Sequence, residues 1–158
     1  MNRPTKTTRE ARACALQVLY QFDMVEVPDH KLVRDSLEEA PGTEADHTHG
    51  FNLATLAWEF RRDADKAIEP LAPDWPTHRQ PAIDRNLLRL AYYEMTHGGV
   101  PAKVAINEAV ELAKEFGSEK SPKFVNAVLD KLWKSTGAAA AEDPAEDPAE
   151  DPAEDGST

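Results

Sequence analysis

Lysine side chains and aromatic rings gather at one corner of the sequence, on either side of residues 117–119. The residues concerned are Lys114, Phe116, Lys120, Lys123 and Phe124. Lysine ammonium groups bind phosphates, and an exposed aromatic ring can stack on an unpaired base. These residues suggest a platform for single-stranded nucleic acid. The alternative is a solvated turn with both phenylalanine rings in the hydrophobic core.

The first predicted helix carries similar chemistry. It should begin near Thr7 or Thr8, either of which can cap it. Its expected buried stripe is Ala11, Cys14, Ala15, Val18, Leu19 and Phe22. Helical periodicity places Arg9, Arg12, Leu16 and Tyr20 together on the opposite side. A soluble helix seldom leaves such a stripe uncovered. Either another helix covers it, or RNA does, through arginine–phosphate contacts and a tyrosine–base stack.

Two helices must position the corner of lysines and phenylalanines. Pro101 suits the first turn of one helix. Its apolar face recurs at three- and four-residue spacing, through Ala102, Ala105, Ile106, Ala109, Val110, Ala113 and Phe116. Gly117 is expected to stop this helix in a left-handed conformation. Ser121 then caps a second helix that Pro122 opens, with Val125, Val128, Leu129 and Leu132 buried.

The remaining periodicity also predicts helices, at 30–40 after the cap Asp29, near 47–70 and at about 81–96. The residues expected to point inward include Leu32, Val33, Leu37, Leu53, Leu56, Ala57, Phe60, Ala64, Ile68, Ile83, Leu87, Leu90 and Met95. Four prolines make 70–81 a connector. We therefore predict one all-α domain over residues 9–135, with about six to seven helices in two sub-bundles, about 9–72 and 77–135.

Both ends of the chain differ from this domain in composition. Residues 1–8 are polar, include Arg3 and Lys6, and are expected to form a mobile basic arm. Residues 136–158 contain a Glu-Asp-Pro-Ala repeat with eight acidic and no basic residues, so we expect a disordered tail. The net charge of −11 comes mostly from this tail, since the rest of the chain has 18 basic and 21 acidic residues. The tail either solubilises the protein or competes with RNA for a basic surface.

Several classes of protein are excluded or disfavoured by the sequence. No stretch of about 18 apolar residues could span a membrane, and no apolar signal segment is present, so a cytoplasmic protein is expected. The single Cys14 cannot form an internal disulfide. We find no phosphate-binding glycine loop, nucleophile motif or cofactor motif, and therefore predict neither an enzyme nor a cofactor. His47 and His49 lack further ligands, so no metal site is predicted.

Several segments together resemble the NusB family of bacterial transcription antitermination factors. The segment VPAKVAINEAVELAKEFG followed by KFVNAVLDKLW is similar to the family's C-terminal signature. The resemblance extends to AIDRNLLRLAYYEM at 82–95 and to ARACALQVLYQFD at 11–23. Residues 24–80 match only loosely, in helix spacing and in Asp65-x-x-Ile68, and the acidic tail matches nothing in the family.

The resemblance implies a module that binds RNA and protein without catalysis. NusB-like proteins pair with a ribosomal protein, NusE, and capture boxA-type single-stranded RNA, joining RNA polymerase mostly on ribosomal RNA operons. The expected phosphate-binding residues are Arg3, Lys6, Arg9, Arg12, Lys103, Lys120 and Lys123. The expected stacking residues are Tyr20, Phe116 and Phe124, with Phe124 preferred because it lies off the buried stripe. The edge with Asp84, Arg85 and Arg89 is expected to face NusE.

This chain also departs from the family pattern. It has fewer arginines before the first helix than the family often has, which predicts weaker and less salt-sensitive RNA binding. Lys120 stands where related sequences often have an acidic residue. Two alternatives therefore stay open: a protein-only adaptor with little RNA affinity, and a homodimer whose interface contains Leu16 and Tyr20.

Overall fold

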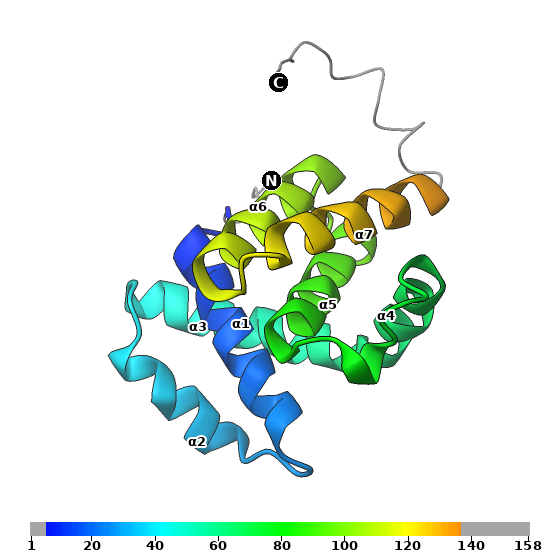
Figure 1. Cartoon of the computed structure of the whole chain (residues 1–158). Coiled ribbons are helices and arrows are strands. Elements are labelled where there is room, and N and C mark those ends of the chain that lie inside the picture. The colour runs from blue at the N-terminus through cyan, green and yellow to red at the C-terminus, as the bar shows by residue number, and fades with distance from the viewer. Residues whose placement is uncertain (1–5, 137–158) are drawn as a thin grey trace.

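The computed structural model describes residues 6–136, and these form α-helices and short 3-10 helices without a strand (Figure 1). The elements are α1 (Arg9–Met24), α2 (His30–Asp35), η1 (Ser36–Glu39), α3 (Glu44–Glu59), α4 (Arg61–Ile68), η2 (Glu69–Leu71), η3 (Thr77–Arg79), α5 (Ala82–Thr96), α6 (Ala102–Phe116) and α7 (Ser121–Ser135). The all-α prediction is confirmed. The predictions for Arg3 and for the acidic tail lie outside the described residues. None of the described helices is both long and apolar enough to cross a membrane.

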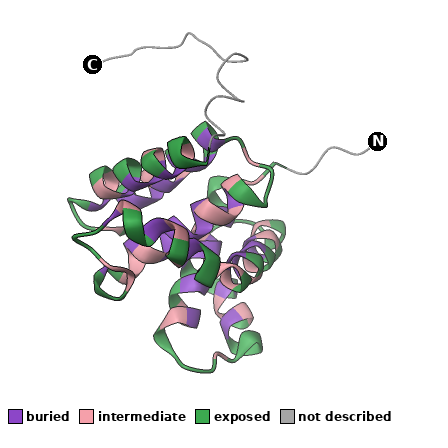
Figure 2. Ribbon diagram, turned by 90° about the vertical axis from the view of Figure 1, so that its right-hand side faces the viewer, coloured by how far each residue is buried: buried purple, intermediate pink, exposed green. Residues whose placement is uncertain are grey.

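Two hydrophobic clusters form the interior, and α1 contributes to both. One cluster joins one face of α1 to α2, η1 and α3, with Leu90 of α5. The other joins α4, α5, α6 and α7, with Leu16 of α1. The buried residues lie on the inward faces of the helices (Figure 2). The two expected sub-bundles are present, but α4 packs with the C-terminal one, so the division falls before the proline connector rather than within it.

The helix predicted near 47–70 is two helices, and this prediction is corrected. Helix α3 begins at Glu44 because Thr43 and Asp46 form a capping box. It ends at Phe60, whose ring stacks on His97 with ring centroids 3.9 Å apart. Helix α4 starts anew at Arg61 and turns towards α5 and α7. Helical periodicity could not predict this ring contact, because Phe60 and His97 are 37 positions apart in the sequence.

Three residues predicted to point inward are exposed. Leu32 on α2 is 66% exposed, and Leu56 and Phe116 also face solvent. The helix predicted at 30–40 shortens to α2 and continues as η1, after the Ser36 hydroxyl donates to the carbonyl of Val33. Leu32 faces solvent, while Val33 and Leu37 are buried.

Gly50 brings α3 against α1. A Cβ at this position would lie 2.5 Å from the carbonyl oxygen of Ala11 and 2.7 Å from the Cβ of Cys14. Only glycine allows the two helices to approach this closely. The contact fixes the first turns of α1, which carry the candidate nucleic-acid-binding residues.

Candidate nucleic-acid interface

The start of α1 is held by Thr8. Its hydroxyl oxygen accepts from the backbone N–H of Ala11 at 3.0 Å and donates to the Asp46 carboxylate at 2.7 Å. Hydrogen bonds from the Thr43 backbone and from Thr8 hold the pKa of Asp46 below its usual value. These hydrogen bonds join the start of α1 to the start of α3. They also orient Arg9, the residue that follows Thr8.

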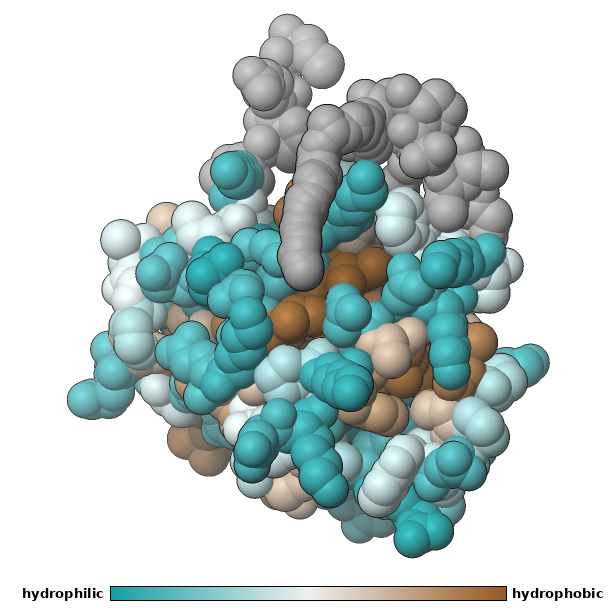
Figure 3. Space-filling view, turned by 45° about the horizontal axis from the view of Figure 1, so that its top comes forward, coloured by the Kyte–Doolittle hydropathy of each residue, from teal (hydrophilic) through white to brown (hydrophobic). Residues whose placement is uncertain are grey.

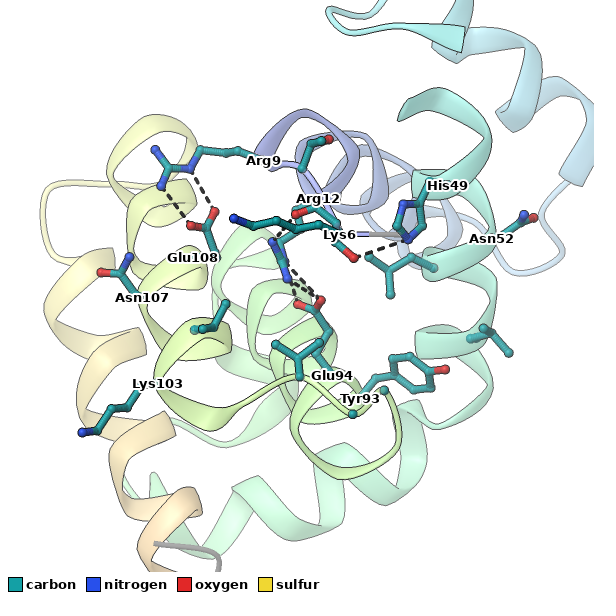
Figure 4. A pocket seen from close by; sticks show the side chains of 18 residues that line it. Lys6, Arg9, Arg12, His49, Asn52, Tyr93, Glu94, Lys103, Asn107 and Glu108 are labelled. Atoms are coloured by element: carbon teal, nitrogen blue, oxygen red, sulfur yellow. Dashed lines mark hydrogen bonds and ion pairs between the residues drawn. The ribbon is translucent and has the colours of Figure 1, made fainter. Parts of the chain in front are cut away.

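Arg9 is exposed but has a partner on α6. Its guanidinium donates to both oxygens of Glu108, at 2.9 and 3.0 Å (Figure 4). The hydrogen bonds and the charge of Arg9 lower the pKa of Glu108. The Arg9 side chain remains 48% exposed, so it can contact a phosphate without leaving Glu108.

Arg12 lies one helical turn further on and is enclosed by protein. Its Nε donates to Glu94 at 3.0 Å, Nη2 lies 2.9 Å from the same carboxylate, and Nη1 donates to the Thr7 carbonyl. The side chains of Arg12 and Glu94 are 6% and 2% exposed. The prediction of Arg12 as a phosphate ligand is therefore corrected, because helix α5 supplies its anion.

The rest of the α1 stripe divides in the same way. Leu16 is buried in the C-terminal cluster, whereas Tyr20 is 39% exposed. Other helices thus cover Leu16, whereas Tyr20 stays accessible to a partner. A homodimer interface predicted from Leu16 and Tyr20 therefore has only Tyr20 available.

A groove of about 1030 Å³ runs between the start of α1, α3, α5 and α6, and we call it the lysine groove. Lys6, Arg9 and Lys103 supply exposed cations, and Leu56 and Val104 supply exposed apolar wall. Figure 4 shows the Lys6 side chain next to Arg12 in the middle of the view and Lys103 at the lower left. On the face at the top of Figure 1, apolar atoms are visible between hydrophilic side chains (Figure 3). The groove offers both charge and apolar surface.

A second groove of about 520 Å³ lies between α1 and the end of α6, and we call it the aromatic groove. Its walls include Tyr20, Phe116 and Ile83, and Arg9 lines both grooves. Phe116 is 44% exposed, whereas Phe124 is half-buried against the C-terminal cluster. The structure therefore exposes Phe116 rather than the Phe124 ring that the sequence favoured.

The cations of the α6–α7 corner are on the surface. Lys120 and Lys123 are exposed, and Lys114 pairs with Glu111 within α6 at 3.1 Å. The aromatic groove, which Arg9 also lines, offers rings for stacked bases beside a cation for a phosphate, and Lys120 and Lys123 add exposed cations at the α6–α7 corner. Glu94 and Glu108 were not predicted as arginine partners. Each lies more than 80 residues from its arginine, and no local sequence pattern indicates the pairing.

The turn between α6 and α7 differs from its predicted form. Gly117 is extended, at φ −95° and ψ −169°, rather than left-handed. A Cβ there would lie 2.5 Å from the Ser121 hydroxyl oxygen, so glycine is needed for close approach. Ser121 is the buried first residue of α7 rather than its cap. Its hydroxyl accepts from the Ser118 N–H and donates to Asp84 on α5 at 2.6 Å.

The edge expected to face NusE is turned inward. Asp84 and Arg89 are buried, and Arg85 is half-buried. Arg85 bonds Asp23 on α1 at 2.8 Å, and Arg89 forms two bonds to Asp65 on α4 at 2.9 and 2.7 Å. Burial opposes ionisation of Asp23, but the arginine contacts keep its pKa below the usual value. These residues join α5 to α1, α4 and α7, which corrects the expectation that they form an exposed edge.

Asp84 provides a test that depends on pH. Burial raises its pKa, against the hydrogen bond from Ser121. The folded state therefore binds this proton more tightly than the unfolded state, so the stability that Asp84 contributes is full below about pH 4 and is lost as pH rises through the folded pKa. Asp84→Asn keeps an oxygen for Ser121 and removes this titration.

We expect Asp84→Asn to be at least as stable as the natural chain at pH 7. The stability difference should shrink as pH falls towards about 4. Urea unfolding at a series of pH values measures it. A difference that grows on acidification would show instead that the folded state favours the charged carboxylate.

No group of three or more His, Cys, Asp or Glu residues within 6–136 is arranged to hold a metal ion. His47 is buried on α3, with Nε2 3.0 Å from the Ala40 carbonyl oxygen, and His49 lies 3.4 Å from the Thr7 hydroxyl. Both histidine rings thus contact other parts of the protein.

A model of the NusB family matches residues 9–134 of this chain. The chain belongs to the NusB family. The resemblance seen in the α6–α7 segment is therefore confirmed, and the match also takes in residues 24–80, where sequence motifs were weak.

Named relatives and a solved structure agree with the family. Transcription antitermination protein NusB of Anaeromyxobacter sp. (strain Fw109-5) is 46% identical over 130 residues, covering 80% of this chain and 89% of that protein. The NusB of Dehalococcoides mccartyi (strain ATCC BAA-2266 / KCTC 15142 / 195) is 39% identical over 139 residues, covering 87% and 97%. The fold is also similar to a chain in a crystal structure of the antitermination factors NusB and NusE in complex with dsRNA. That match has a TM-score of 0.72 and 25% identity and covers 84% of this chain and 99% of that one.

Proposed function

We propose that this NusB-family chain is a transcription antitermination factor. It would bind boxA-type single-stranded RNA together with NusE and join RNA polymerase during ribosomal RNA transcription. Membership of the family supports this, as do relatives named for antitermination. The observation that carries the proposal is the aromatic groove, which Arg9 lines together with the exposed rings of Tyr20 and Phe116. Its role is binding in the cytoplasm, without a catalytic step or a cofactor.

The proposed RNA surface follows exposure rather than residue type. Phosphates would contact Lys6, Arg9, Lys103, Lys120 and Lys123, all of which are exposed, and Arg3, outside the described residues, stays a predicted phosphate contact. Bases would stack on Tyr20 and Phe116 in the aromatic groove, and Phe124, which is half-buried, is the third stacking candidate. Arg12 supports this surface from inside, because its ion pair with Glu94 fixes α1 on α5.

Asp84, Arg85 and Arg89 have a different proposed role towards NusE. Their charged groups already have partners on α1, α4 and α7. We infer that they act on partner binding only by holding α5 in place. The protein-only adaptor remains the competing function, and RNA binding decides between them.

The test is a salt titration of binding to a short boxA-like single-stranded RNA, with and without NusE. We expect the natural chain to bind RNA in a salt-sensitive way, more tightly when NusE is present. Lys120→Ala and Lys123→Ala should each lower the log–log salt slope by roughly 0.7, the value for one phosphate contact with a single strand. Lys66→Ala, an exposed lysine on α4, is the matched control and should leave the slope unchanged. Binding of NusE without RNA affinity in either state would support the adaptor instead.

A further inference from the structure

The chain leaves the described structure at one end of the lysine groove. Helices α6 and α7 have 15 residues each, contact one another and are joined by a four-residue turn, so they run antiparallel. Ser135 at the end of α7 therefore lies at the same end of the pair as Ala102 at the start of α6. Lys103 is the second residue of α6 and lines the groove. The last described residues of the chain thus lie at the Lys103 end of this groove.

The lysine groove has surplus positive charge. Its two carboxylates, Glu94 and Glu108, are each bonded to an arginine that lines the same groove. Lys103 forms no ion pair with any residue of the described range 6–136, and Lys6 likewise has no carboxylate within ion-pair distance there. The two lysines are therefore available to an anionic occupant.

The tail matches this groove in charge, composition and length. Pairs of acids at 142–143, 146–147, 150–151 and 154–155 alternate with Pro-Ala, so each repeat offers two carboxylates and one apolar dipeptide. The carboxylates complement Lys103 and Lys6, and Pro-Ala complements the walls at Leu56 and Val104. The seven residue-to-residue steps from Thr136 to Asp143 span up to about 24 Å when the chain is extended. This reach is similar to the length of α6, about 22 Å for 15 residues.

We propose that the acidic repeat of this chain, residues 142–155, docks in the lysine groove. The occupied groove places negative charge beside Arg9, which also lines the aromatic groove. The tail then competes electrostatically with RNA for this surface, a consequence that rests on the proposed RNA-binding function. The docking itself does not depend on RNA, so the two can be tested separately.

The docking test compares the full chain with a full-length variant in which the eight tail acids become Gln or Asn. Methyl NMR signals of Val104 and Leu56 report on the groove, and Leu32, exposed on α2, is the control. We expect Val104 and Leu56 to shift between the two proteins at about 50 mM salt, and the shifts to fade near 0.5 M, where screening is strong. Leu32 should stay unchanged. Groove signals that are identical in the two proteins, or a shift of equal size at Leu32, would overturn the docking.

The competition test uses the same two proteins and a boxA-like single-stranded RNA. A tethered segment acts at an effective concentration in the millimolar range. We therefore expect the neutral tail to tighten RNA binding a few-fold at about 50 mM salt. Lys103→Ala should reduce this gain, whereas Lys66→Ala should preserve it. Groove shifts with no gain in RNA affinity would overturn the competition while supporting the docking. Absence of RNA binding in every form would overturn the proposed function, and the methyl signals would still decide the docking.

Discussion

Replacing Arg12 by alanine is expected to destabilise the fold by about 3–5 kcal/mol, because it leaves a buried carboxylate without its counter-charge. Glu94 is 2% exposed, and three of its contacts with Arg12 are between 2.9 and 3.1 Å. The change also removes the bond to the Thr7 carbonyl, which helps to hold the start of α1. Urea or guanidinium unfolding measures the loss.

Two comparisons show whether burial is the cause. Arg9→Ala removes a similar ion pair at the surface and should destabilise the fold far less than Arg12→Ala, since solvent screens exposed pairs. Arg12→Met combined with Glu94→Leu should recover much of the loss, because it leaves no unpaired charge. If Arg12→Ala were as mild as Arg9→Ala, the buried pair would not be holding α1 on α5.

The contrast between Arg9 and Arg12 shows where prediction from sequence reached its limit. Both arginines lie on one helix, three residues apart, and helical geometry places them on the same side. Whether each arginine is exposed or buried depends on α5 and α6, which come 70 or more residues later and supply Glu94 and Glu108. Helical periodicity describes a face but does not say which part of that face another helix covers.

The local signals in the sequence were more informative about helices than about tertiary contacts. Thr8 and Asp29 cap α1 and α2 as predicted, and the buried stripes of α1 and α7 are those expected. Gly117 does end α6, but through close approach to Ser121 rather than a left-handed backbone. That approach depends on the Ser121–Asp84 bond between α7 and α5, across 37 residues. The sequence thus predicted the helices that carry the candidate residues, while the fold determines which of these residues are exposed and which are buried.

Phe116→Ala is expected to weaken binding of a boxA-like single-stranded RNA by about 1–3 kcal/mol, or roughly 5- to 150-fold, the range for losing one stacked base. The ring is 44% exposed in the aromatic groove, beside Tyr20 and close to Arg9, so a base can reach its face. Because little of the ring packs in the core, the free energy of unfolding should change by only about 0.5 kcal/mol. Fluorescence anisotropy at fixed salt gives the affinity, and chemical unfolding gives the stability.

Phe124→Ala is the informative partner of this variant. Phe124 packs half-buried against the C-terminal cluster, so its loss should cost more stability and, among folded molecules, less RNA affinity than the loss of Phe116. Trp75→Ala, an exposed aromatic residue in the connector outside both grooves, controls for non-specific loss of aromatic surface. A larger affinity loss from Phe124 at equal folded fraction would place the stacking face on α7 instead. The bases would then stack on the face of α7 that carries Phe124 rather than on the exposed rings of the aromatic groove.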